Sequence, residues 1–243
     1  MFMTAQETRS FLLRDADRYV ASMTSADLRA RKQTTHVEYK QKTADAARDF
    51  TTDEKARLRD HIRQCDDFFR ILKPDNPTGQ PIDGITMVQI PWVFAKTEGR
   101  VLEEGLPHTR ENIILLDAHT LQEPPLVLAT TLVHEKIHVY QRIYRSLFQQ
   151  WCRQQGYIRF KPRNTESLIR ANPDVDPWIY LGPSVSALQK EPVPMMVRYS
   201  SDNPTGIRDV ESSAHVLTEH PNEEVAYTMA DIFVKWAQNK QSQ

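Results

Sequence analysis

Apolar residues recur at helical spacing in the first 75 residues, which predicts an N-terminal helical region. Its first apolar stripe consists of Phe11, Leu12, Tyr19 and Met23. A second short helix is expected over 25–32. The run from Thr51 to Glu54 is typical of a capping box, with Thr51 as N-cap. The helix that follows should end before Pro74.

Prolines and glycines between residues 74 and 85 predict a loop and a boundary between two regions. Two strand-like runs come next. The run over 85–94 is interrupted by Pro91, so a short strand or an edge strand is expected there. The run over 112–116 is uniformly apolar and predicts a cleaner strand.

The longest periodic segment begins at Pro124-Pro125 and continues to Gly156, and it predicts one helix of about 30 residues. Short strands are expected over 157–160, 178–181 and 193–200, in a region that prolines interrupt repeatedly. An amphipathic pattern from Glu223 to Trp236 predicts a final helix.

Composition narrows the class of protein. The chain has 243 residues, of which 40% are hydrophobic and 7 are glycine, and its net charge is −1. A folded domain with a real core is therefore expected. Neither glycine-rich phosphate-binding motif occurs. The balanced charge argues against a nucleic-acid partner, and no apolar run is long enough for a membrane span. With Cys65 and Cys152 as its only cysteines, and without a signal peptide, the chain is expected in the cytoplasm.

The run from His134 to His138 reads H-E-x-x-H and lies inside the long predicted helix. Residues four apart lie one above the other on a helix face, so both imidazoles can reach one metal ion at about 2.0–2.1 Å. Glu135 would project beside the metal without binding it. From there it could take a proton from an activated water.

This motif resembles the active-site helix of the zincin metallopeptidases. The resemblance implies Zn²⁺ as cofactor, a small sheet whose edge strand binds extended substrate, and a third ligand further along the chain. Neither the metzincin extension nor the inverted motif is present. The acidic start of the last predicted helix is similar instead to the gluzincins, the thermolysin-like branch, in which a glutamate on a second helix completes the site.

Glu223 and Glu224 both stand at that position, and only one can face the metal because adjacent helical residues point about 100° apart. Glu223 is preferred because small Ala226 shares its face and leaves room for two helices to pack. Glu224 remains the alternative, although it would share its face with the larger Tyr227 and Thr228.

Other positions are weaker candidates. The resemblance implies a tyrosine or histidine that stabilises the oxyanion, and Tyr199 and His215 are the expected residues. His220 is expected to shape the start of the last helix. The segment 107–110 would line the cleft if the strand after it is the substrate-binding edge. Gln141, Arg145 and Asp231 are expected to support the metal ligands without binding the metal, and Lys161, Arg163 and Arg170 are expected to be solvated charges.

The sequence therefore predicts an α+β protein with an N-terminal helical region (1–75) and a zincin-like catalytic domain (76–243). The predicted function is zinc-dependent hydrolysis of peptide bonds in a peptide or protein substrate. Zn²⁺ would be held by His134, His138 and Glu223, with Glu135 as general base. The alternative is a zinc-binding protein of the same fold with a non-proteolytic binding or structural role.

Overall fold

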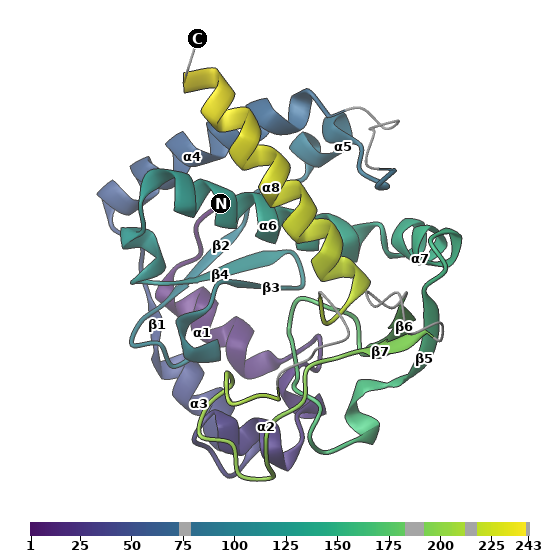
Figure 1. Ribbon diagram of the computed structural model, residues 1–243. Coiled ribbons are helices and arrows are strands. Elements are labelled where there is room, and N and C mark those ends of the chain that lie inside the picture. The colour runs from purple at the N-terminus through teal and green to yellow at the C-terminus, as the bar shows by residue number, and fades with distance from the viewer. Residues whose placement is uncertain (73–78, 183–191, 212–217, 242–243) are drawn as a thin grey trace.

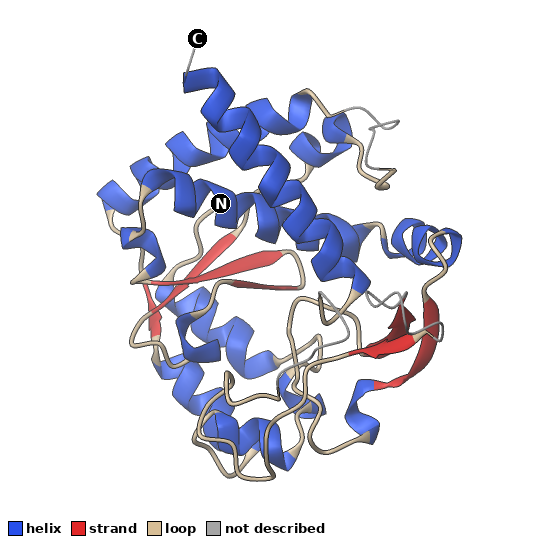
Figure 2. Ribbon diagram, in the orientation of Figure 1, coloured by secondary structure: helices blue, strands red, loops and turns tan. Residues whose placement is uncertain are grey.

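Helices and two small sheets make up the chain, as the expected α+β class requires (Figure 1; Figure 2). The computed structural model describes residues 1–72, 79–182, 192–211 and 218–241. The helices are α1 (Ala5–Arg14), α2 (Ser25–Ala30), α3 (His36–Asp45), α4 (Thr52–Arg70), α5 (Gly84–Gln89), α6 (Pro125–Ile143), α7 (Arg145–Gln154) and α8 (Pro221–Gln241). The strands are β1 (Ala47–Arg48), β2 (Phe94–Thr97), β3 (His108–Arg110), β4 (Ile113–Asp117), β5 (Ile158–Pro162), β6 (Trp178–Gly182) and β7 (Val193–Met195).

The larger sheet has the strand order β1-β2-β4-β3. β2 and β4 are parallel, whereas β1 and β3 pair antiparallel with them at the two edges. The strand expected over 112–116 is confirmed as β4, but it lies inside the sheet. The edge strand beside it is β3, which comes from the segment expected to line a cleft.

Alternate residues of β4 face two different layers of helices. Ile114 and Leu116 belong to a buried cluster with residues of α4, α6 and α8. Ile113 and Leu115 belong to a second cluster with residues of α1 and α3. The sheet is thus covered on both faces, with α6 and α8 on one side and α1 and α3 on the other (Figure 1).

Residues of the N-terminal region, predicted over 1–75, pack in the same buried clusters as residues from the rest of the chain. β1 pairs with β2, and Phe2 forms a bridge with Phe94. Phe68 and Phe69 of α4 pack in the cluster that contains α6. The boundary expected near residue 75 therefore does not separate two cores.

The strand expected over 85–94 is wrong for most of its length, because residues Gly84–Gln89 form helix α5. The Asp83 carboxylate caps this helix by accepting hydrogen bonds from the backbone N–H groups of Ile85 (3.3 Å) and Thr86 (3.2 Å). A short apolar run suits either a helix or a buried strand, and here the cap decides. The strand β2 begins only at Phe94.

The single long helix expected up to Gly156 is also wrong. It is interrupted at Tyr144, whose φ of −105° and ψ of 41° are not helical, and it therefore forms α6 and α7. The apolar spacing continues across the interruption, so the pattern alone does not reveal it. The expected final helix is confirmed as α8.

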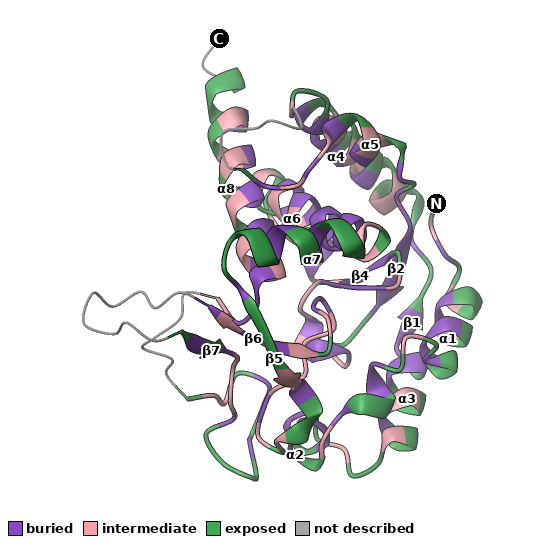
Figure 3. Cartoon of the chain, turned by 90° about the vertical axis from the view of Figure 1, so that its right-hand side faces the viewer, coloured by how far each residue is buried: buried purple, intermediate pink, exposed green. Residues whose placement is uncertain are grey.

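Of the three short strands expected after residue 156, the first two are confirmed as β5 and β6. The third, expected over 193–200, is a strand only over Val193–Met195 (β7). The three form an antiparallel sheet with the order β5-β6-β7. β5 is its edge, and its first three residues are exposed (Figure 3). Cys65 and Cys152 are buried free thiols. Among the described helices, none is both long and apolar enough to cross a membrane.

Candidate metal centre

Two crossing helices bring the three predicted ligands together. His134 and His138 lie one turn apart on α6, and Glu223 lies in the first turn of α8. The two histidine Nε2 atoms are 3.0 Å apart. Glu223 Oε2 lies 3.4 Å from the Nε2 of His134 and 3.6 Å from that of His138. No other group of three such side chains in the described residues comes as close together.

These separations fit a tetrahedral zinc site. Ligand atoms at 2.0–2.1 Å from a tetrahedral ion are about 3.3 Å from one another, and the three distances lie on both sides of this value. The ligand types, two imidazoles and one carboxylate, also match a zinc site with an open fourth position.

Electrostatics at the cluster favour positive charge. Burial alone would lower the pKa of His138, but the Glu223 carboxylate, together with Asp174 and Glu135, outweighs burial and raises this pKa to about 9. Burial would raise the pKa of Glu223, yet His138 and His134 hold it well below its usual range. The Glu223 carboxylate favours a protonated imidazole at this cluster. The same negative charge would attract a divalent cation.

Amide side chains orient two of the three ligands. His138 Nδ1 lies 2.8 Å from Gln141 Oε1, and the Gln141 amide in turn donates to the carbonyl of Asn222 at 2.9 Å. This arrangement favours a proton on Nδ1 of His138, so Nε2 would be the nitrogen that binds a metal when a metal replaces its proton. Asn172 Nδ2 donates to Glu223 Oε1 at 2.8 Å. Gln141 therefore lies behind a metal ligand and orients it, as expected from the sequence.

Glu135 lies on the wall of the same cavity but is not one of the three clustered ligands. Thr109 donates its hydroxyl to Glu135 Oε2 at 2.9 Å, which leaves Oε1 without a described partner. Asp174 lies close by and accepts a hydrogen bond from the backbone N–H of Thr109 at 2.5 Å. Burial, and then the Glu135 carboxylate, raise the pKa of Asp174 well above its usual range.

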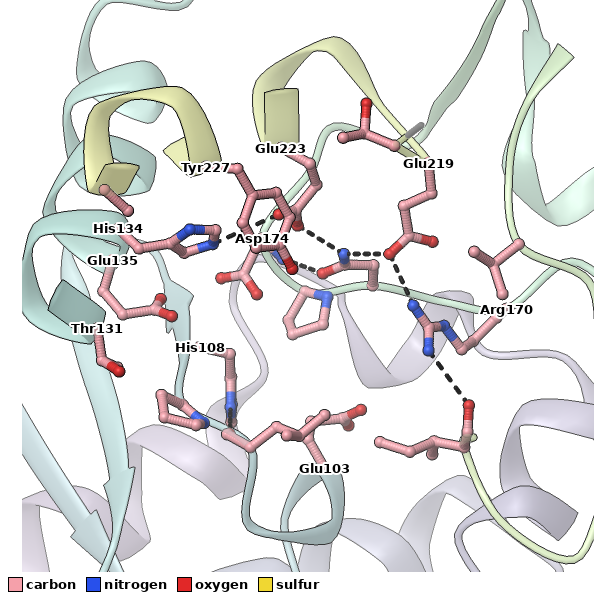
Figure 4. A pocket seen from close by; sticks show the side chains of 18 of the residues that line it. Glu103, His108, Thr131, His134, Glu135, Arg170, Asp174, Glu219, Glu223 and Tyr227 are labelled. Atoms are coloured by element: carbon pink, nitrogen blue, oxygen red, sulfur yellow. Dashed lines mark hydrogen bonds and ion pairs between the residues drawn. The ribbon is translucent and has the colours of Figure 1, made fainter. Parts of the chain in front are cut away.

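The cluster opens into a cavity of about 540 Å³. α6 supplies His134 and Glu135, α8 supplies Glu223 and Tyr227, and the opposite wall comes from β3 and from the chain around residues 170–174 (Figure 4). The ring of Tyr227 packs edge-on against His134, with centroids 4.7 Å apart. A volume of this order is typical of pockets for small ligands.

The two adjacent glutamates have different surroundings. Glu224 accepts a hydrogen bond from the hydroxyl of Tyr157 at 2.6 Å and does not line the cavity. Glu223 is buried and lies beside both histidines. The geometry therefore brings Glu223 to the cluster and directs Glu224 away from it.

The expected oxyanion residues do not meet at this site. Tyr199 is fully buried elsewhere, where its hydroxyl donates to Asp27 at 3.0 Å and accepts from Arg31 at 3.1 Å. Its predicted catalytic role has no geometric support, because a tyrosine inside a closed core can satisfy its hydroxyl there. His215 lies outside the described residues. His220 accepts from the backbone N–H of Asn222 at 3.0 Å, so it caps α8 as expected.

Several charged residues are placed differently from the expectation. Arg110 was expected at a cleft but is buried in ion pairs with Asp15 and Asp17 on the other face of the sheet. Arg145 is exposed and lines other cavities. The expected solvation of Arg163 and Arg170 is wrong, since both pair with a buried carboxylate. Their partner is Glu219, which lies at 3.5 Å from Arg163 and at 2.8 Å from Arg170.

Sequence reasoning missed three residues of the site. Asn172 and Asp174 lie in a segment without periodic pattern, so only the tertiary fold brings them to the cavity. Tyr227 carried a signal, because it lies one turn after Glu223 and therefore on the same helix face. Asp231, a further turn along α8, also lines the cavity and is exposed.

No family model, curated protein or solved structure matches this chain. The likeness to zincins therefore remains a likeness of one motif and its surroundings, and no family is assigned.

Proposed function

We propose that this protein is a zinc-dependent hydrolase of peptide bonds, with His134, His138 and Glu223 as ligands. The observation that carries the proposal is the spacing of the three ligand atoms, which suits one tetrahedral ion beside a cavity. The adjacent Glu135 supports a catalytic rather than a purely structural use of the metal.

Zinc in such a site supplies Lewis-acid chemistry that lowers the pKa of water and polarises a carbonyl group. Glu135 then acts as general base. Thr109 holds Oε2 of Glu135 in place, so Oε1 takes the proton from the attacking water and afterwards passes it to the leaving amine.

Tyr227 is the hydrogen-bond donor that we assign to the developing oxyanion, in place of Tyr199. It lines the cavity beside His134. Burial and the Glu223 carboxylate raise the pKa of Tyr227 to about 12, so the hydroxyl keeps its proton at neutral pH. A donor placed where negative charge develops lowers the barrier.

The alternative function is zinc binding without hydrolysis. A structural site has four protein ligands and no use for a nearby base. Glu135 is only 3% exposed, and burying a carboxylate with one hydrogen-bond donor costs free energy. A catalytic role gives a reason for this cost.

The substitution Glu135→Gln tests the assignment. It preserves the size of the side chain and removes only its basicity, so zinc content and melting temperature should stay close to those of the parent. Hydrolysis of a mixed peptide library should fall by at least about 10²-fold. Zinc content is measured by mass spectrometry, and cleavage is measured by detecting the peptide fragments that form.

Glu224→Gln is the matched control, because it changes a carboxylate that points away from the cavity. It should retain both zinc and activity. Equal cleavage by the parent and Glu135→Gln would refute the role of Glu135. Bound zinc without any cleavage by the parent would favour the non-proteolytic alternative.

A further inference from the structure

The sheet edge beside the site is β3, which pairs with β4 on one side only. In an antiparallel pair, alternate residues direct their backbone groups outward. The outward positions of this segment are Pro107 and Thr109, since both backbone groups of Thr109 bond outside the sheet. A peptide that joined the sheet as an additional strand would have to pair with these two positions.

Neither position offers a free N–H group. Pro107 has none. The Thr109 N–H donates to the buried Asp174 carboxylate at 2.5 Å, and the Thr109 carbonyl accepts from Arg142 Nη2 at 3.0 Å. Proline and a covering segment are two of the devices by which proteins close a sheet edge.

The covering segment also supports the candidate metal site. The backbone N–H of Asp174 donates to Asn172 Oδ1 at 2.8 Å. Asn172 Nδ2 in turn donates to Glu223 at 2.8 Å and to Glu219 at 2.7 Å. If a substrate strand displaced Asp174 from Thr109, it would disturb the residues that hold Glu223 in place.

Resting on the proposed hydrolase function, we infer that the substrate is a short peptide held by side chains in the cavity, not an extended segment of a long polypeptide added to β3. The cavity of about 540 Å³ is bounded on one side by the segment around residues 170–174. It has the size of a small-ligand pocket, most of whose contacts come from side chains. Because the edge of β3 is closed, the site should bind short peptides in preference to long ones.

The activity test compares one cleavable sequence in two lengths. A library of di- to tetrapeptides identifies the best-cleaved peptide, and the same sequence is then placed in the middle of a 20-residue peptide. The zinc-loaded protein should cleave the short form with kcat/KM at least ten times higher. Equal or faster cleavage of the long form would overturn the inference and leave the hydrolase proposal intact.

A second measurement does not depend on turnover. In zinc-loaded Glu135→Gln, the backbone amide proton of Thr109 should resonate at low field, because it makes a short hydrogen bond of 2.5 Å to the Asp174 side chain. Saturation with the best-cleaved short peptide should leave this resonance and its slow exchange with solvent unchanged. A change in the chemical shift of this amide proton on peptide binding would show that the peptide adds to β3 as a strand, and it would refute the inference. If zinc binds but neither peptide length is cleaved, the hydrolase proposal fails, and this inference fails with it.

Discussion

Glu223 and Glu224 are adjacent on α8, yet only Glu223 touches the histidine pair. Glu223→Ala should lower zinc affinity steeply, because two remaining protein ligands hold zinc poorly. Glu224→Ala should leave zinc affinity unchanged and alter the free energy of unfolding only modestly, by about 1 kcal/mol for one hydrogen bond. Competition with a chromophoric chelator measures both affinities. The reverse order would transfer the ligand role to Glu224.

Glu103 is a buried carboxylate at the cavity wall, and it ties the N-terminal helices to the loop before β3. It accepts hydrogen bonds from Arg31 Nε at 2.9 Å and from the hydroxyl of Tyr39 at 2.7 Å. Burial would raise the pKa of Glu103, but Arg31, together with His108 and Tyr39, outweighs burial and holds it at about 2, below the ordinary 4.5. The stabilisation is therefore fully present above pH 4.5 and is lost as the pH falls toward 2.

Glu103→Gln should accordingly lower the free energy of unfolding at pH 7 by up to about 3–5 kcal/mol. The buried Arg31 would then keep only the Asp27 carboxylate, at 3.5 Å, as its charged partner. The loss of stability between pH 4.5 and pH 2 should be less steep than in the parent. Urea unfolding at a series of pH values measures both effects. Glu98→Gln is the control, since its ion pair with Arg48 is exposed and should contribute at most about 1 kcal/mol. A parallel pH dependence in parent and Glu103→Gln would contradict the assigned pKa.

At the scale of elements, the start of helix α4 could be predicted from the sequence, because neighbouring residues cap it. Thr51 Oγ1 accepts from the Glu54 N–H at 3.2 Å, and the Glu54 carboxylate accepts from the Thr51 N–H at 2.8 Å. Thr51→Ala should therefore cost about 1 kcal/mol of stability. Thr52→Ala, one exposed position further on, should cost less than half of that. Thermal unfolding compares the two, and equal losses would show that the cap contributes nothing.

Elements whose start or end is decided by one residue were predicted less well. The interruption at Tyr144 does not disturb the apolar spacing, so α6 and α7 look like one helix in the sequence. The run after Gly84 is apolar enough for a strand, but Asp83 caps it as a helix. In both cases a single backbone position, not the periodicity, decides the element.

For the whole molecule, sequence reasoning predicted the class of fold and the clustered residues His134, His138 and Glu223. The two histidines could be predicted because four residues of helix fix their relation. The order of strands in the sheet and the cover over β3 could not, because both depend on contacts between residues far apart in the chain. Asp174, for example, reaches Thr109 across 65 positions.

The candidate ligands connect two helices that pack extensively, so metal binding should stabilise the whole fold. α6 carries His134 and His138, and α8 carries Glu223. A ligand that binds only the folded state adds about 2.7 kcal/mol at 100 times its Kd. For a chain of this length, 1 kcal/mol corresponds to roughly 2–4 °C in Tm.

Addition of zinc at 100 times its Kd to the chelator-treated protein should therefore raise Tm by roughly 5–10 °C, as measured by differential scanning calorimetry. His138→Ala should lose this shift, because its removal leaves one imidazole and one carboxylate. Glu135→Gln should keep the shift, because Glu135 is not a ligand in the proposed site. A shift that persists in His138→Ala would mean that zinc binds elsewhere on the chain. Loss of the shift in Glu135→Gln would make Glu135 part of the metal site and remove the proposed general base.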